Sequence, residues 1–301
     1  MLRVVAVLLI SAGLIAASPV RVPTSAPLAN SFGIFYGKSF TNLEDYSHPG
    51  ALLIAGNCNR YDPRFQAARA RGAELLAYLN PIEVYNVIPC KLNVGFYMGG
   101  RHNVPLWPYP AYGTRSNYKN TRMADIRVGS PWVDHVVDYI AQLMREGKVD
   151  GVFLDNTSAK LWGNLSKWST WEQSERDAWT AGSIDLVRRL DEKRRQINPR
   201  FLIVTNGFWD RGDKMGFAGE QYVDGVMLEH SRFDEWHKRY AGRNFSNLGH
   251  RRVLVIARDA EDAQLWARWP GVTHVSDQDK YDSPNKPPVP FSIPGGTNAG
   301  R

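Results

Sequence analysis

Two eight-residue stretches of this 301-residue chain repeat one pattern, VDGVFLDN at residues 149–156 and VDGVMLEH at residues 223–230. Each starts with an Asp-Gly turn signal, continues with a short apolar run typical of a buried strand, and ends in a carboxylate, Asp155 or Glu229. Side chains alternate along a strand, so the two carboxylates occupy matching positions. Burial of an unpaired carboxylate is unfavourable or shifts its pKa, so packing alone does not explain these acids.

Strands and helices alternate along the rest of the chain. Apolar runs predict strands at residues 32–36, 51–56, 73–79, 201–205, 253–257 and 272–275, in addition to the two repeated stretches. Helical composition or periodicity predicts helices at residues 63–71, 131–146 and 261–268, and a long helix that ends at Ile197 before Asn198 and Pro199. Residues 81–130 are rich in Gly, Pro, Asn and aromatics and predict a long functional loop.

This alternation predicts the α/β class, with a parallel sheet and right-handed crossovers. Eight strands within residues 30–283 fit the length of a single-domain (β/α)8 TIM barrel. A doubly wound open sheet is the alternative. It is less favoured because no Gly-x-Gly-x-x-Gly fingerprint follows the first strand.

The N-terminus predicts export. Arg3 precedes an apolar run at residues 4–17, a pattern that predicts a signal peptide at residues 1–18. The apolar run is shorter than the roughly 20 residues that a membrane-spanning helix needs. The cleavage site before Pro19 is poor, which leaves an uncleaved short anchor as the alternative. Residues 19–29 form a Pro-rich leader and residues 284–301 a Pro/Gly-rich tail predicted to be disordered. We therefore expect a secreted, periplasmic or extracellular protein.

Cys58 and Cys90 are the two cysteines of the chain. An even count in an exported protein predicts one disulfide, which would join two loops at the barrel mouth with Cα atoms within about 7 Å. Two free thiols are the alternative. The histidines are scattered and no Cys-x-x-Cys occurs, so neither a structural metal nor a cofactor is expected.

The formal charge of +7 raises the question of a nucleic-acid partner. Its basic residues concentrate in residues 188–195, where acids are interleaved at helical spacing, as on a solvated helix face. No RNA-binding, zinc-finger or P-loop pattern accompanies the charge. We therefore expect no nucleic-acid partner, and a mouth that is neutral or acidic.

In a barrel, polar residues at the carboxyl ends of the strands line the mouth. Asp155 ends the fourth strand and Glu229 the sixth, so their side chains are expected within about 5–9 Å of each other. This separation suits glycoside hydrolysis by either a retaining or an inverting route. Asp155, beside Asn156, is expected to be the ionised nucleophile or base, and Glu229 the proton donor.

Two other interpretations of the acids remain open. They could pair with basic residues at the rim, for instance Arg258. They could instead bind a metal together with His230, although His230 points to the opposite strand face from Glu229.

Other polar and aromatic residues near the strand ends could bind a sugar, because amides and phenols hydrogen-bond hydroxyls and indoles stack on pyranose rings. Trp168 and Trp171 are further stacking candidates, whereas Trp179 is assigned to the core. The predicted substrate-binding residues are Tyr36, Asn57, Tyr78, Asn80, Asn156, Trp162, Asn206, Trp209 and Arg258.

The pattern Gly-Val-x-x-Asp-Asn at residues 151–156, preceded by Ala-Asp-Ile-Arg at residues 124–127 and a helix, resembles the secreted endo-α-1,4-polygalactosaminidase family of glycoside hydrolases and related glycosidase barrels. The resemblance extends from about Phe32 to Val275. It implies a (β/α)8 barrel and a catalytic pair at Asp155 and Glu229. It also implies that Asp125, at an acidic position of the family motif, lies at the substrate cleft.

These observations predict an exported glycoside hydrolase that cleaves an extracellular or cell-wall polysaccharide. Galactosamine-containing polymers are among the candidate substrates. The alternative is a non-catalytic carbohydrate-binding barrel. Neither function requires a cofactor, and no membrane span is expected apart from the alternative of a short N-terminal anchor.

Overall fold

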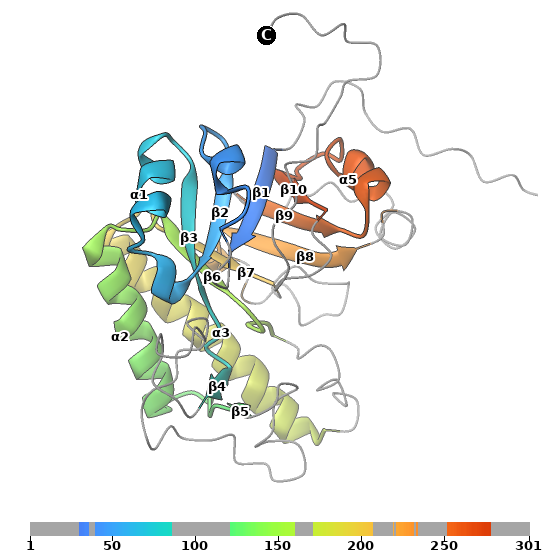
Figure 1. Cartoon of the computed structure of the whole chain (residues 1–301). Coiled ribbons are helices and arrows are strands. Elements are labelled where there is room, and N and C mark those ends of the chain that lie inside the picture. Colours follow the sequence, from blue (N-terminus) through green and yellow to red (C-terminus); the bar gives the residue numbers. More distant parts are fainter. Residues whose placement is uncertain are drawn as a thin grey trace, which may run out of the picture.

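The computed structural model describes residues 30–35, 40–85, 121–159, 171–206, 219, 221–231, 233 and 252–277. Within these ranges, eight parallel strands close into a barrel in the order β1-β10-β9-β8-β7-β6-β3-β2 (Figure 1). Closure is direct, because β1 pairs with both β2 and β10. The predicted (β/α)8 barrel is confirmed, and the open sheet is ruled out.

The barrel strands lie where the apolar runs predicted them. They are β1 (Asn30–Phe35), β2 (Leu52–Gly56), β3 (Glu74–Leu79), β6 (Gly151–Leu154), β7 (Leu202–Thr205), β8 (Gly225–Ser231), β9 (Arg252–Ala257) and β10 (His274–Ser276). The helices are α1 (Pro63–Ala70), α2 (Pro131–Glu146), α3 (Gln173–Ile197) and α5 (Ala260–Trp266), with short 3-10 helices η1 (Leu43–Tyr46) and η2 (Asn57–Asn59).

Helix α2 shows how local signals set the element boundaries. The Ser130 hydroxyl accepts the Trp132 N–H at 3.2 Å, which caps the first turn, and Gly147 ends the helix with a φ of 60°. The predicted apolar stripe is buried against the barrel, and it comprises Val133, Val136, Val137, Ile140 and Leu143.

A second sheet was not predicted. β4 (Glu83–Tyr85) pairs antiparallel with β5 (Thr121–Met123), inside the stretch expected to be a loop. Three-residue strands give no periodicity, and the partner strand lies more than thirty residues along the chain. Because β4 starts four residues after β3 ends, this sheet lies beyond the carboxyl end of the barrel (Figure 1).

Two apolar layers build the core. Side chains between the barrel and its helices form the larger one. The barrel interior is filled by side chains that alternate along the strands, namely Phe32, Ile34, Leu52, Ile54, Leu76, Tyr78, Phe153, Leu202, Val204, Met227, Leu254 and Ile256. No helix in the described ranges is long and apolar enough to cross a membrane.

The Asp-Gly pairs that open the repeated stretches have the same structural role twice. Asp150 Oδ2 accepts the N–H of Leu75, the second residue of β3, at 2.9 Å, and Asp224 Oδ2 accepts the N–H of Ile203, the second residue of β7, at 2.9 Å. Each aspartate therefore anchors the start of the neighbouring strand.

An arginine from a helix completes each anchor. Arg69 of α1 binds Asp150 through Nε and Nη2, and Arg194 of α3 forms an ion pair with Asp224. Two-point binding of this kind fixes the Arg69 guanidinium on its carboxylate. The helix that precedes each neighbouring strand is thereby tied to the amino end of the barrel.

The glycines of the two Asp-Gly pairs are required for the same reason, which is the close approach of the next strand. A Cβ atom on Gly151 would lie 2.4 Å from the Leu202 carbonyl oxygen, and one on Gly225 would lie 2.5 Å from the Arg252 carbonyl oxygen. Leu202 and Arg252 are the first residues of the next strands, β7 and β9. Only glycine allows the strands to approach this closely.

The basic stretch at residues 188–195 lies on α3, as predicted. Arg188 pairs with Asp185 and with Glu192, and Arg189 pairs with Asp134 of α2. These guanidinium groups are matched by acids along the helix surface, so the local charge is largely balanced.

Candidate active site

Three side chains meet at the carboxyl end of the barrel. Asp155 follows β6, Asn206 follows β7, and Glu229 belongs to β8. The Asn206 amide nitrogen donates to Asp155 Oδ1 at 2.5 Å and to Glu229 Oε1 at 3.3 Å. Because one nitrogen reaches both oxygens, these oxygens of Asp155 and Glu229 lie within about 6 Å of each other.

Asp155 receives hydrogen bonds on both oxygens. The Tyr78 hydroxyl donates to Oδ2, and the backbone N–H of Asn156 donates to Oδ1 at 2.8 Å, beside the Asn206 amide. Burial raises the pKa of Asp155 above its usual value near 3.8, while these three hydrogen bonds oppose the rise. The expected polar setting is present in the hydrogen bonds, but desolvation of this partly buried carboxyl has the stronger influence on its pKa.

Asn156 connects this group to a carboxylate that sequence reasoning missed. Its backbone is left-handed, with a φ of 54°, and its side-chain amide donates to Glu83 Oε2 at 3.0 Å. The Asn80 amide donates to the same oxygen at 2.9 Å. The signal in the sequence was Asn80-x-x-Glu83, directly after the third strand.

No family model and no curated protein matches the sequence. Among solved structures, the glycoside hydrolase domain of PelA from Pseudomonas aeruginosa is similar, with a TM-score of 0.51 and 14% identity over 87% of this chain and 98% of that domain. The chain shares the fold of a glycoside hydrolase domain. A variant of the PelA domain matches over the same shares, with a TM-score of 0.50 and 13% identity.

A glycoside hydrolase family 36 α-galactosidase from Geobacillus stearothermophilus is a more distant match. In complex with raffinose, a variant of it has a TM-score of 0.38 and 12% identity over 66% of this chain and 30% of its own. Membership of the polygalactosaminidase family, which the sequence resemblance implies, stays a prediction.

The other predicted site residues of the barrel have varied surroundings. Asp125 is buried after β5 and binds Arg127 through both carboxylate oxygens, at 3.0 Å to Nε and 2.8 Å to Nη2. Its charge is therefore compensated within its own loop. Its predicted place at the substrate cleft stays a prediction.

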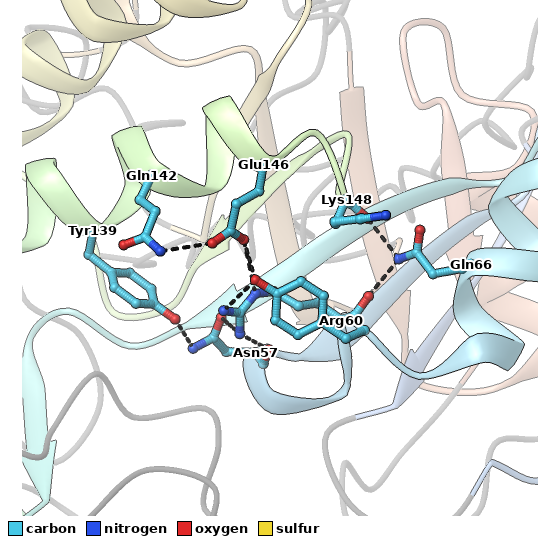
Figure 2. A network of polar contacts seen from close by, with 8 residues as sticks. Asn57, Arg60, Gln66, Tyr139, Gln142, Glu146 and Lys148 are labelled. Carbon is cyan, nitrogen blue, oxygen red and sulfur yellow. Dashed lines mark hydrogen bonds and ion pairs between the residues drawn. The ribbon is translucent and has the colours of Figure 1, made fainter.

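Asn57 belongs to a polar network at the outer side of the barrel, between η2 and α2 (Figure 2). Its amide donates to the Tyr139 hydroxyl at 2.5 Å, and its side-chain oxygen accepts from Arg60 at 3.2 Å. Glu146 of α2 extends the network through an ion pair with Arg60. Through these bonds Asn57 joins η2 to α2. Its predicted contact with a sugar stays a prediction.

Arg258 is exposed and forms no ion pair with either acid in the described part of the chain. This speaks against the interpretation in which Arg258 neutralises the pair. Trp171 is buried and packs edge-on against Trp179, with ring centroids 5.8 Å apart, so it offers no open face to a sugar. Trp179 is a core residue, as predicted.

The structure describes only some of the residues on which the metal and disulfide predictions depend. Across the described ranges, no group of three or more His, Cys, Asp or Glu residues could hold a metal ion. Cys58 lies in η2 and is not a free thiol. Its predicted partner, Cys90, lies outside the described residues, so the pairing stays a prediction.

Several further predictions fall outside the described residues or side chains. They concern Tyr36, Trp162, Trp168, Trp209, the side chain of His230, the N-terminal residues 1–29, most of the expected loop and the C-terminal tail.

Proposed function

We propose that this protein is a glycoside hydrolase that cleaves a polysaccharide with Asp155 and Glu229 as its catalytic pair. The observation that supports this most directly is the Asn206 amide, which binds an oxygen of each acid at once. It holds the nearest oxygens of the two carboxylates within about 6 Å of each other, at the barrel end where such folds carry their chemistry. The fold shared with the PelA domain is consistent with this function.

The separation favours a retaining mechanism, for which carboxylates about 5 Å apart are typical. An Asp155 oxygen attacks the anomeric carbon while Glu229 transfers its proton to the departing glycosidic oxygen. The glycosyl–Asp155 ester then reacts with water, whose proton returns to Glu229. An inverting enzyme would need a wider gap to hold a water between acid and sugar.

The hydrogen bonds favour Asp155 as the nucleophile. Tyr78, Asn206 and the Asn156 N–H donate to its oxygens, as suits an ionised carboxylate. Because burial raises the pKa of Asp155, the acidic limb of the activity profile should lie above the ordinary aspartate value of 3.8. Activity should therefore fall as the pH drops through this raised value.

The substrate is proposed to be a polysaccharide outside the cell. Two sequence features support this location: residues 1–18 have the pattern of a signal peptide, and the chain has an even number of cysteines, two, as is typical of exported proteins with a disulfide. Galactosamine-containing polymers follow from the family resemblance of residues 124–127 and 151–156. We further propose that Cys58 pairs with Cys90.

The test is hydrolysis of defined polymers. Purified protein is incubated with amino-sugar and neutral polysaccharides, and new reducing ends are measured, with proton NMR to report the anomer formed first. We expect one polymer class to be cleaved with retention, and Asp155→Asn and Glu229→Gln to be inactive. Asp134→Asn, an exposed acid on α2, is the matched control and should retain full activity. Near-wild-type turnover by Asp155→Asn would refute the mechanism.

The same panel separates the enzyme from a non-catalytic binding barrel. A binder would retain a polymer in affinity electrophoresis without releasing reducing ends, and Asp155→Asn would leave this retention unchanged. The Glu229→Gln variant of an enzyme should lose least on substrates with activated leaving groups, because these need little protonation.

A further inference from the structure

Glu83 is a buried carboxylate that the catalytic pair does not use. Its side chain is fully buried, and it lies in β4, where it pairs with Met123 of β5. The turn before it is held by α2, because the Trp132 indole N–H donates to the Pro81 carbonyl oxygen at 2.7 Å. A carboxylate without solvent needs hydrogen-bond donors, so its partners show what it does.

The first donor is Asn80, whose side-chain amide is fixed in one orientation by hydrogen bonds to the backbone. Its side-chain oxygen accepts the backbone N–H groups of Ile82 at 3.2 Å and of Glu83 at 2.9 Å. The amide nitrogen therefore faces Glu83 and donates to Oε2. This turn presets the Glu83 carboxylate as an acceptor, independently of anything on β6.

The second donor is Asn156, which follows Asp155 directly. Its amide donates to the same Oε2 at 3.0 Å, while its backbone stays left-handed. Asparagine tolerates this conformation better than most residues, but the conformation still needs support from its surroundings. From this conformation the Asn156 N–H reaches Asp155 Oδ1 at 2.8 Å.

We propose that Glu83 is a positioning residue, which clamps the Asn156 amide so that the Asn156 N–H stays directed at Asp155. This role rests on the proposed function of Asp155 as nucleophile. The chain of contacts runs from the β3–β4 turn through Asn80, Glu83 and Asn156 to the reacting carboxylate. The second sheet thus has a purpose, since β4 carries the clamp to the barrel mouth.

The clamp makes a specific electrostatic prediction. The Asn156 N–H is one of the hydrogen bonds that lower the pKa of Asp155. If Glu83→Gln or Asn156→Gly loosens this bond, the pKa of Asp155 rises and the acidic limb of activity moves to higher pH by about 0.5 to 1 unit. A purely structural defect would lower the amount of folded protein without moving this limb.

The experiment is a double-mutant cycle of Glu83→Gln and Asn156→Gly, in which glycine keeps access to the left-handed backbone. Each single variant should lower kcat by about tenfold and change KM by less than about threefold. The double variant should be no slower than the slower single variant, because both break one chain of contacts. Multiplying effects, or an unmoved acidic limb, would overturn the clamp.

A readout without turnover separates this inference from the proposed function. In protein labelled with carbon-13 at the aspartate carboxyl, the Asp155 signal is assigned by its loss in Asp155→Asn and then titrated. Its midpoint should rise in Glu83→Gln and in Asn156→Gly, and rise no further in the double variant. An unchanged midpoint in both single variants would overturn the clamp, even if no polymer is cleaved.

A control variant and a fallback complete the design. Glu146→Gln alters a hydrogen-bonded glutamate in the outer network of Figure 2 and should leave the Asp155 midpoint unchanged. If Glu83→Gln does not fold, Asn156→Gly tests the clamp alone, because it leaves the buried Glu83 and its Asn80 partner in place. A wild-type midpoint in Asn156→Gly would then overturn the inference.

Discussion

The two ends of the repeated strands place carboxylates in opposite surroundings. At the amino ends, Asp150 and Asp224 each bind an arginine and a backbone N–H of the neighbouring strand. At the carboxyl end, Asp155 is bound by a phenol, an amide and a backbone N–H, all of them neutral. The chemical group is the same, and its partners differ in charge.

This difference decides what each carboxylate can do. A guanidinium supplies a full opposite charge in a fixed geometry, so the aspartate that it binds serves as a structural anion. Neutral donors orient a carboxylate without cancelling its charge, which leaves it able to attack or to take up a proton. One strand would therefore support stability at its amino end and the proposed chemistry at its carboxyl end, as is general for barrels of this fold.

A hollow at the amino end of the barrel shows the same matching of charges. This open hollow has a volume of about 690 Å³ and is lined by two ion pairs, Arg69–Asp150 and Arg252–Glu74, and by Arg200. Its acids are matched by arginines, unlike Asp155. The partners of each carboxylate therefore separate the proposed active site from this hollow.

The largest effect that we expect concerns turnover. Asp155→Asn should lower kcat by about a thousandfold or more, because the nucleophile is removed, whereas Asp224→Asn should leave kcat per folded molecule within about twofold. Initial rates on the cleaved polymer, normalised to folded protein by circular dichroism, measure both. A large loss of kcat in folded Asp224→Asn would break the division between the two ends.

The next effect concerns stability and has the reverse pattern. Asp224→Ala removes the acceptor of the Ile203 N–H and one of the two acids bound by Arg194, the other being Asp191, and should lower the free energy of unfolding by about 3 kcal/mol. Asp150 and Arg69 are each about a third exposed, with 31% of either side chain accessible, so Asp150→Ala should cost only about 1 kcal/mol. Urea unfolding measures both losses. Equal losses would show that burial does not govern these anchors.

Much of this division was readable in the sequence. The repeated stretches at residues 149–156 and 223–230 predicted two buried strands with acids at matching ends, and eight apolar runs predicted the barrel. These signals are local, since strand periodicity and turn residues act over a few positions. The Asp-Gly pairs were interpreted only as turns, because their arginine partners come from helices about thirty or eighty residues earlier.

The parts that escaped prediction depend on contacts between distant residues. The Asn80-x-x-Glu83 spacing alone does not reveal that Glu83 is buried, because its burial is created by β4, a three-residue strand whose partner lies far along the chain. Trp171 was a candidate for sugar stacking, yet it packs on Trp179 of α3, and an aromatic residue in a loop has the same local pattern in either role. Composition near a strand end identifies candidates, and tertiary packing decides among them.

The two ends should also respond differently to acid. His274 is buried in β10, and burial lowers its pKa to about 4, with the neighbouring Arg252 contributing. The unfolded chain takes up this proton near pH 6.5, so stability that is complete above pH 6.5 is lost as the pH falls toward 4. The loss should reach about 2 kcal/mol at pH 5. Chemical unfolding at pH 7 and pH 5 measures it, and His274→Gln should remove most of the difference.

The smallest effect has the opposite sign and tests the mouth alone. Burial raises the pKa of Asp155, so the folded state is penalised near pH 7, where this carboxyl is driven to ionise. The penalty disappears as the pH falls through the raised pKa. Asp155→Asn removes it at every pH, and the new amide can accept from Asn206 and donate to the Tyr78 oxygen.

We therefore expect Asp155→Asn to increase the free energy of unfolding by about 0.5–2 kcal/mol at pH 7, and by less at pH 4, while abolishing turnover. Urea unfolding at the two pH values measures the gain, with Asp134→Asn as the control that should change stability little. A loss of stability at pH 7 would mean that Asp155 is a structural anion like Asp224. The contrast between the two ends of the barrel would then fail at the residue on which the proposed chemistry depends.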